Sequence, residues 1–158
     1  MSDSILYRLY QPADFAQLYA VEELCFERPF RFSRAYMRRL VQSQNGATWI
    51  AEARAQLAGF AIVEWARAHG ETSAYIETIE VDPAWRRRGI STELMRRVED
   101  SARAARASTI WLHVDAGNFA AIRLYEGREY ARQGREEHFY ARHRAALVYA
   151  KSLSSSDA

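Results

Sequence analysis

The residues best suited to chemistry lie where a strand pattern meets a helix pattern. An apolar run ends at Val81, and the residues Arg86-Arg87-Arg88-Gly89 follow shortly after it. The first N–H groups of a helix have no partners within the helix, and the helix dipole is positive there, so such a junction favours an anion. Gly89 permits close backbone approach, and the arginines can pair with a phosphate. The glycine spacing of dinucleotide-binding loops and the Gly-Lys-Ser/Thr of Walker loops are both missing.

This junction resembles the acyl-CoA pyrophosphate loop of the GCN5-related N-acetyltransferase (GNAT) family. The family pattern is Arg/Gln-x-x-Gly-x-Gly/Ala after a strand. Arg86 and Gly89 match it, whereas Ser91 stands at the last small position.

A second motif of that family follows later in the chain. The run from Leu112 to Tyr125 resembles its Leu-x-Val, short turn, Asn-x-x-Ala and Leu-Tyr sequence, which forms the other wall of the CoA cleft. Glu129-Tyr130 replaces the usual Gly-Phe that comes next. The resemblance covers nearly the whole chain and is most specific over residues 76–95 and 112–140.

The resemblance implies an α/β (α+β) fold in a single N-acetyltransferase domain, residues 1–151, followed by a disordered tail, residues 152–158. The sheet is expected to be mixed and mostly antiparallel, with six to seven strands and about four flanking helices. The fourth and fifth strands are expected to splay apart around a CoA cleft.

Apolar spacing and turn residues place the elements along the chain. Strands are predicted at 5–9, 48–53, 57–64, 73–81 and 110–114, before a terminal hairpin over 131–140 and 145–150. Helices are predicted at 12–26, after a Ser33 cap, at 88–106 and after an Asn118 cap. Glu99 is expected to face outward from the third helix, opposite its apolar stripe.

The resemblance also implies acetyl-CoA as a cosubstrate and no metal. Most of the expected CoA contacts come from the strand and loop around Gly89, and the rest from the second motif. The residues expected to bind CoA are Ile79, Glu80, Val81, Arg86, Arg87, Arg88, Gly89, Ile90, Ser91, Thr92, Asn118 and Tyr125.

Acetyl transfer to an amine needs a base for the amine proton and an acid for the leaving thiolate. By resemblance, Tyr125 is the candidate acid, and His113 or Glu77 is the candidate base. The alternatives are a packed tyrosine, a structural histidine and an ordinary strand carboxylate. Strand alternation predicts that Glu77 and Glu80 lie on opposite faces of their strand.

The candidate base bears on the acceptor. An α-amine has a pKa of about 7.7 to 8.0, so imidazole suffices as its base, whereas a lysine-like amine near 10.4 costs about 4 kcal/mol to deprotonate at neutral pH. His113 therefore favours the α-amine of a protein or peptide, and the predicted acceptor-binding residues are Phe30, Arg31, Phe32 and Tyr140. Glu77 would favour a small-molecule amine, such as a polyamine or an antibiotic. The substitutions at Ser91 and Glu129 leave open a non-catalytic acyl-CoA-binding module.

Composition limits the remaining possibilities. The 158 residues are 49% hydrophobic, which suffices for one globular core. A net charge of +2 with dispersed basic residues does not indicate nucleic-acid binding. Cys25 is the only cysteine, which excludes an internal disulfide, and it is expected to be buried and unreactive. No basic leader or membrane-length apolar run is present, so we expect a cytoplasmic monomer or homodimer.

Overall fold

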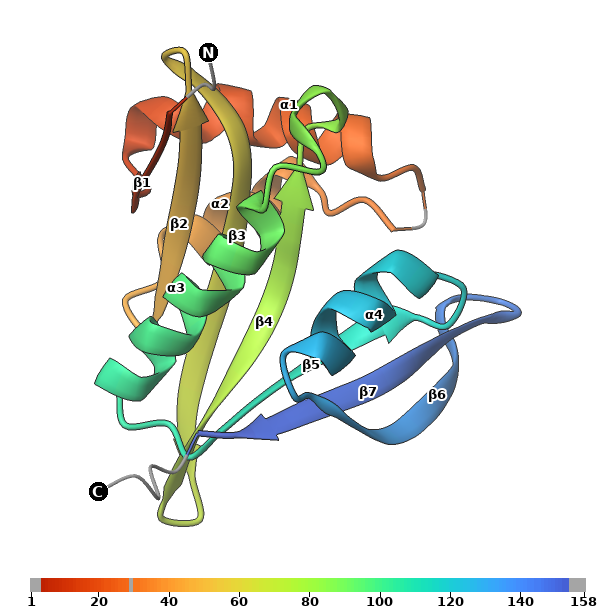
Figure 1. Ribbon diagram of the computed structural model, residues 1–158. Helices are drawn as coiled ribbons and strands as arrows, with labels where there is room; N and C mark the ends of the chain where they lie inside the picture. The colour runs from red at the N-terminus through yellow and green to blue at the C-terminus, as the bar shows by residue number, and fades with distance from the viewer. Residues whose placement is uncertain (1–3, 29, 154–158) are drawn as a thin grey trace.

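The computed structural model describes residues 4–28 and 30–153 (Figure 1). It contains the expected mixture of strands and helices, and the predicted fold class is confirmed. In chain order the elements are β1 (Ile5–Leu9), α1 (Phe15–Cys25), α2 (Arg34–Val41), β2 (Gly46–Ala53), β3 (Gln56–Ala68), β4 (Glu71–Val81), α3 (Ile90–Ala104), β5 (Thr109–Asp115), α4 (Phe119–Gly127), β6 (Ala131–Ala141) and β7 (Arg144–Ser152).

The strands form one seven-stranded sheet in the order β1-β2-β3-β4-β5-β7-β6. β4 and β5 are the parallel neighbours, and the other adjacent pairs in this order are antiparallel. The parallel ladder is short, from Ser73 opposite Thr109 to Ile76 opposite Leu112. Beyond it the two strands separate, as Figure 1 shows, so the expected splay between the fourth and fifth strands is confirmed.

Helices cover both faces of the sheet (Figure 1). Because side chains alternate along a strand, neighbouring residues of β3 serve different cores. Phe60 packs with Leu18 of α1 and Met37 of α2, whereas Ala61 packs with Met95 of α3. α1 and α2 therefore share one face, and α3 covers the other.

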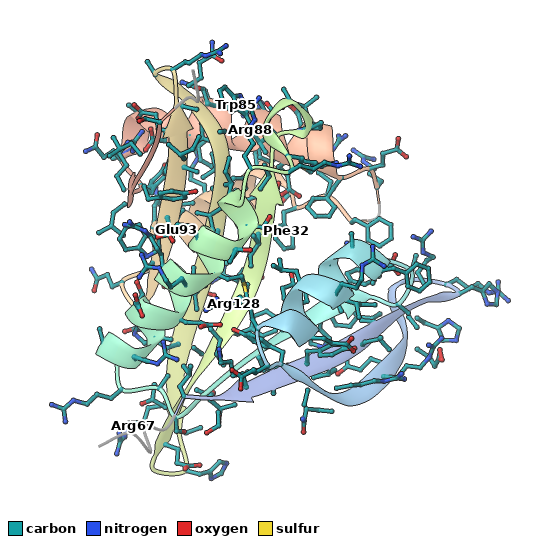
Figure 2. The ribbon with its side chains drawn as sticks, in the orientation of Figure 1. Phe32, Arg67, Trp85, Arg88, Glu93 and Arg128 are labelled. Atoms are coloured by element: carbon teal, nitrogen blue, oxygen red, sulfur yellow. The ribbon has the colours of Figure 1, made fainter. Side chains whose placement is uncertain are left out.

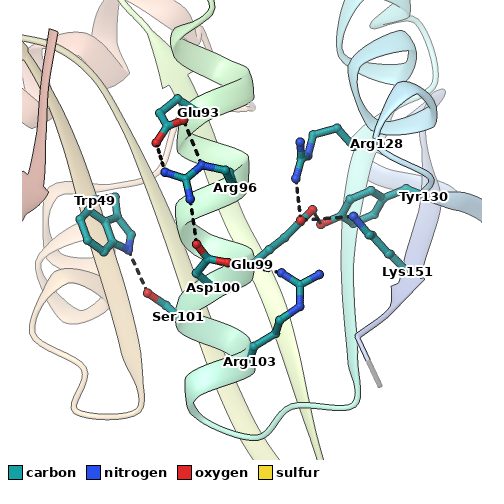
Figure 3. A network of polar contacts seen from close by, with 10 residues as sticks. All are labelled: Trp49, Glu93, Arg96, Glu99, Asp100, Ser101, Arg103, Arg128, Tyr130 and Lys151. Carbon is teal, nitrogen blue, oxygen red and sulfur yellow. Dashed lines mark hydrogen bonds and ion pairs between the residues drawn. The ribbon is translucent and has the colours of Figure 1, made fainter. Parts of the chain in front are cut away.

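Glu99 of α3 is buried, so the prediction that it faces solvent is wrong. It is 1% exposed. Its carboxylate accepts hydrogen bonds from Arg128 at 2.8 Å, from the Tyr130 hydroxyl at 2.8 Å and from Lys151 at 3.2 Å (Figure 3). These partners follow α4 or lie in β7, so their proximity is not visible in the local pattern of α3. The cluster joins α3 to the C-terminal half of the sheet.

The ordered chain also extends beyond the predicted boundary at residue 151. β7 ends at Ser152, and Leu153 is 5% exposed and donates its N–H to the Ser108 carbonyl at 2.8 Å. The rest of the predicted tail, residues 154–158, lies outside the described residues. Within the part of the chain that is described, no helix is long and apolar enough to cross a membrane.

Candidate active site

Two cavities open where β4 and β5 separate. The larger has a volume of about 540 Å³, and the smaller about 270 Å³. The residues that line both are Phe26, Ile79, Asn118, Ala121 and Tyr125. Ligands occupying the two cavities would therefore meet at this common wall.

The junction around Gly89 forms one end of the larger cavity. Gly89 precedes the first residue of α3 with a φ of 76°, a left-handed conformation that glycine adopts without strain. The first turn of α3, with its unpaired N–H groups, lines the cavity directly after it. All residues predicted to bind CoA line this cavity except Arg88.

Two of the three arginines contact the protein itself. Arg86 donates from Nε to the Val81 carbonyl at 3.2 Å and lies 3.6 Å from the Cys25 sulfur. The Arg88 guanidinium lies 4.7 Å from the centre of the Trp85 ring, and Figure 2 shows the pair near the start of α3. Cys25 also lines the larger cavity, and burial is the main cause that raises the pKa of its thiol. These contacts fix the shape of the loop.

The smaller cavity collects the remaining predicted residues. The segment between α1 and α2 forms one wall and the β6–β7 hairpin another, and the rings of Phe30 and Tyr140 meet across them at 4.9 Å. The predicted catalytic and acceptor-binding residues that line it are Phe30, Arg31, Phe32, Glu77, His113, Tyr125 and Tyr140.

His113 is held by three neighbours. The Tyr75 hydroxyl lies 2.7 Å from Nδ1, and the Phe139 ring stacks on the imidazole at 4.1 Å with an interplanar angle of 14°. A Glu136 oxygen lies 3.1 Å from Nε2, but Nε2 has no partner with hydrogen-bond geometry among the described residues. The imidazole is therefore fixed through Nδ1, which leaves Nε2 as the ring nitrogen without a hydrogen bond in the described chain.

Tyr75 is a site residue that the sequence did not reveal. Burial and then the Glu77 carboxylate raise the pKa of its hydroxyl above the ordinary value, so it stays protonated. Its proximity to His113 depends on the parallel pairing of β4 with β5, in which Tyr75 lies opposite Trp111. The available signal was a histidine two residues beyond Trp111, on the same face of β5 as the residue opposite Tyr75.

Tyr125 lies at the common wall of the cavities. Asn118 caps α4 by accepting the Ala121 N–H at 3.2 Å, as predicted, and the helix then places Tyr125 two turns later. Tyr125 is 8% exposed, and burial raises its pKa to about 12. A phenol with this pKa is protonated at neutral pH and can donate.

A β-bulge at Glu77 overturns the predicted alternation of β4. Ile62 pairs with Thr78 but the next residue, Val63, pairs with Ile76, so Glu77 is the extra residue. Glu77 consequently contacts the Tyr36 hydroxyl of α2 at 3.4 Å. Burial, and then the neighbouring Glu64 carboxyl, raise its pKa to about 7.

Glu80 lies on the same face as Glu77, because its carboxyl faces Glu22 of α1. Their exposures are 2% for Glu80 and 1% for Glu22. Glu80 lines the larger cavity and Glu22 the smaller. Glu80 was predicted from its backbone position alone, and Glu22 was missed because a glutamate in an amphipathic helix ordinarily faces solvent.

Comparison with known proteins agrees with this arrangement. Streptothricin acetyltransferase from Streptomyces lavendulae is 38% identical over 84 residues, which cover 53% of this chain and 43% of that protein. Ribosomal protein bS18-alanine N-acetyltransferase from Salmonella typhimurium is 32% identical over 84 residues, or 51% of this chain and 57% of that protein. The chain thus spans about half the length of these relatives.

The fold has close structural counterparts. Arabidopsis thaliana NAA60, in its crystal structure with a bisubstrate analogue, superposes with a TM-score of 0.85 at 24% identity, covering 94% of this chain and 98% of that chain. This likeness concerns the fold. Residues 15–130 match the sequence profile of the acetyltransferase (GNAT) family. With that match over most of its length, the chain belongs to the acetyltransferase (GNAT) family.

Proposed function

We propose that this chain is an acetyl-CoA-dependent N-acetyltransferase that transfers acetyl directly to the α-amine of a protein or peptide in the cytoplasm. The observation that carries the proposal is the meeting of the two cavities at Tyr125, with His113, held by Tyr75, lining the smaller one. The larger cavity is the proposed acetyl-CoA site, and the smaller is the proposed acceptor site.

The residues support a direct transfer. The amine nitrogen attacks the thioester carbonyl, the new N–C bond forms and the C–S bond breaks. His113 accepts the amine proton, directly or through water, while Tyr125 gives its proton to the departing thiolate. For Nε2 to accept a proton, Nδ1 must carry the ring hydrogen and donate it to the Tyr75 oxygen at 2.7 Å. The Glu136 carboxylate, 3.1 Å from Nε2, then stabilises the imidazolium.

The acceptor cavity supports a peptide end. Phe30 and Phe32, from the segment between α1 and α2, and Tyr140, from β6, provide ring surfaces, and Arg31 adds a donor. An α-amine has a pKa of about 7.7 to 8.0, so a substantial fraction of it is neutral near physiological pH, which suits a histidine base.

A small-molecule amine is the second candidate acceptor. It is favoured by the Glu77 and Glu64 carboxyls, which could hold an additional cationic group. Identity to streptothricin acetyltransferase, 38% over 84 residues, also supports it.

Thiol release from acetyl-CoA tests the proposal against both alternatives. The purified protein would be assayed with peptides of varied N-terminal residue and with a matched set of polyamines and amino-modified antibiotics. We expect release with peptides, and no release when the same peptides carry a blocked N-terminus. Release with small amines alone would establish the second candidate. Calorimetric binding of acetyl-CoA without release to any amine would identify a non-catalytic module.

A further inference from the structure

Phe32, in the wall of the proposed acceptor site, is hydrogen-bonded to two side chains of α1. Its N–H donates to Glu22 Oε2 at 2.8 Å, and its carbonyl accepts from the Tyr19 hydroxyl at 2.7 Å. Tyr19 and Glu22 are three residues apart, so they lie on the same face of α1. Both backbone polar groups of one residue in the proposed acceptor site are therefore held by α1 side chains.

Glu22 also connects this wall to β4. Its carboxyl faces the Glu80 carboxyl. Within the described residues, neither Glu22 Oε1 nor Glu80 Oε1 has a hydrogen-bond partner. The remaining Glu80 oxygen accepts from the Thr78 hydroxyl at 2.7 Å. Two nearly inaccessible carboxyls thus face each other between the two cavities.

Such a pair is stable only if it holds a proton. Two buried carboxylates without a cation between them repel, and a shared proton converts the repulsion into a hydrogen bond. Burial, followed by the Glu22 carboxyl, raises the pKa of Glu80 well above its ordinary value, so Glu80 carries the proton. A protonated Glu80, which accepts from the Thr78 hydroxyl, can then donate to Glu22, which accepts from the Phe32 N–H.

We propose that Glu22 and Glu80 form a proton-dependent latch that holds the acceptor loop, residues 30–32, against β4, and that Glu22 is a positioning residue for the acceptor. This inference rests on the proposed acetyl transfer. It adds that acceptor binding depends on the protonation of Glu80, a group outside the reacting atoms.

The charges around the latch determine its response to pH. Cys25 of α1 faces Glu80, and Arg86 and Asp82, from the loop after β4, lie beside Cys25. Arg86 contacts Cys25 and the Val81 carbonyl, and within the described chain it forms no hydrogen bond with either latch carboxyl. Rising pH therefore removes the Glu80 proton without supplying a replacement cation, and the loop loosens.

The kinetic test compares acceptor KM in the wild type and in Glu80→Gln between about pH 6 and pH 9.5. The amide of the variant donates to Glu22 at every pH, so the latch stays closed. Taking the ratio of wild-type to variant KM at each pH cancels the pH dependence that the two proteins share, including that of the acceptor amine. We expect this ratio to rise about tenfold with pH, the scale of one lost charge-assisted hydrogen bond. Glu23→Gln, an exposed neighbour on α1, is the matched control and should follow the wild type. If the ratio of wild-type KM to Glu80→Gln KM does not change with pH, the latch is contradicted.

Comparing Glu22→Ala with Glu22→Gln distinguishes a role in positioning the acceptor from a general role in folding. Glu22→Ala removes the acceptor of the Phe32 N–H and should raise acceptor KM about tenfold with little change in kcat, whereas Glu22→Gln keeps an acceptor oxygen and should restore KM. Equal KM values in the two variants contradict the positioning role.

Amide exchange tests the latch without any substrate. The protection factor of the Phe32 amide, corrected for its intrinsic exchange rate, should fall about tenfold with rising pH in the wild type and stay constant in Glu80→Gln. Identical profiles in the two proteins refute the latch even if acetyl transfer is observed. Distinct profiles support it even if every tested amine fails as an acceptor, so the two proposals can fail separately.

Discussion

Tyr75 and His113 share a hydrogen bond across the widening end of the β4–β5 ladder, with the phenol oxygen 2.7 Å from Nδ1. The strands are still paired at Ile76 and Leu112 and are separate immediately beyond them. The pair therefore lies at the narrow end of the cleft, where the two strands begin to separate.

Removing either partner should slow acetyl transfer. We expect His113→Ala to lower kcat/KM for the acceptor by about a hundredfold or more, because it deletes the proposed base. Tyr75→Phe keeps the ring but removes the hydrogen bond to Nδ1. The fall in kcat/KM should therefore be smaller, about tenfold, and the pH optimum should shift. Thiol release as a function of pH measures both. His69→Asn, in the exposed turn between β3 and β4, should behave as wild type; a comparable loss there would remove His113 from the proposed role.

Tyr125→Phe should separate turnover from binding. The phenol is expected to protonate the leaving thiolate, so kcat should fall by about a hundredfold while the calorimetric affinity for acetyl-CoA changes by less than about threefold. Tyr7→Phe, on β1 far along the sheet, serves as the control. Full turnover in Tyr125→Phe would exclude it as the acid.

Gly89→Ala should weaken acetyl-CoA binding through the backbone. A Cβ at this position meets no atom within 4 Å, but φ is 76°, and the left-handed region costs a residue with a Cβ about 1 to 2 kcal/mol. Relaxation of that strain would move the first turn of α3, and we expect affinity to fall about tenfold or more. A Cβ at Gly134 also meets no atom within 4 Å, but Gly134 lacks a positive φ. Gly134→Ala is therefore the control that separates backbone strain from the added methyl group. Equal affinities for the two variants would mean that the loop does not bind the cosubstrate.

Glu99→Ala should destabilise the fold without altering the chemistry. It leaves the partly buried cations Arg128 and Lys151 without their carboxylate, which typically costs about 3 to 5 kcal/mol for a buried pair. Urea denaturation measures the free energy of unfolding. The neighbouring Asp100→Ala, whose side chain is 55% exposed, should cost less than about 1 kcal/mol. A similar cost for both would show that the Glu99 cluster contributes little.

Glu77 gives stability a defined dependence on pH. Its pKa of about 7 in the folded chain exceeds that of an unfolded glutamate, about 4.3, so the folded state binds more protons between these values. The free energy of unfolding should therefore decline as pH rises from about 4.3 to 7. Thermal unfolding scans should show a shallower decline for Glu77→Gln than for the wild type. Glu71→Gln, exposed at the start of β4, is expected to keep the wild-type slope; an unchanged slope in Glu77→Gln contradicts the assignment.

The parts of the site that the sequence predicted are those encoded by adjacent residues. Gly89 and Asn118 each determine a helix start through local backbone chemistry, so the cofactor loop and α4 could be located directly. Glu99 was misplaced because its three partners come from distant segments. The faces of Glu77 and Glu80 were also misassigned, because a bulge is a property of two paired strands and not of one.

Tyr75 and Glu22 were missed for a related reason. Tyr75 becomes a site residue only through the parallel register with β5, and Glu22 only through the packing of α1 on β4. Both depend on which elements lie next to each other. Sequence periodicity identifies an element and its apolar side, but it does not identify the neighbour across the gap.

The separation of β4 from β5 gives this sheet two additional edges in its interior. Outer edge strands such as β1 and β6 can pair with a strand of another chain, which is why exposed edges carry an aggregation risk. The inner edges are flanked by α4, the segment between α1 and α2, and the β6–β7 hairpin. Beyond Ile76 and Leu112 the backbone groups on these inner edges have no partner strand in the described chain, so a ligand in the cavities can pair with them as a neighbouring strand would.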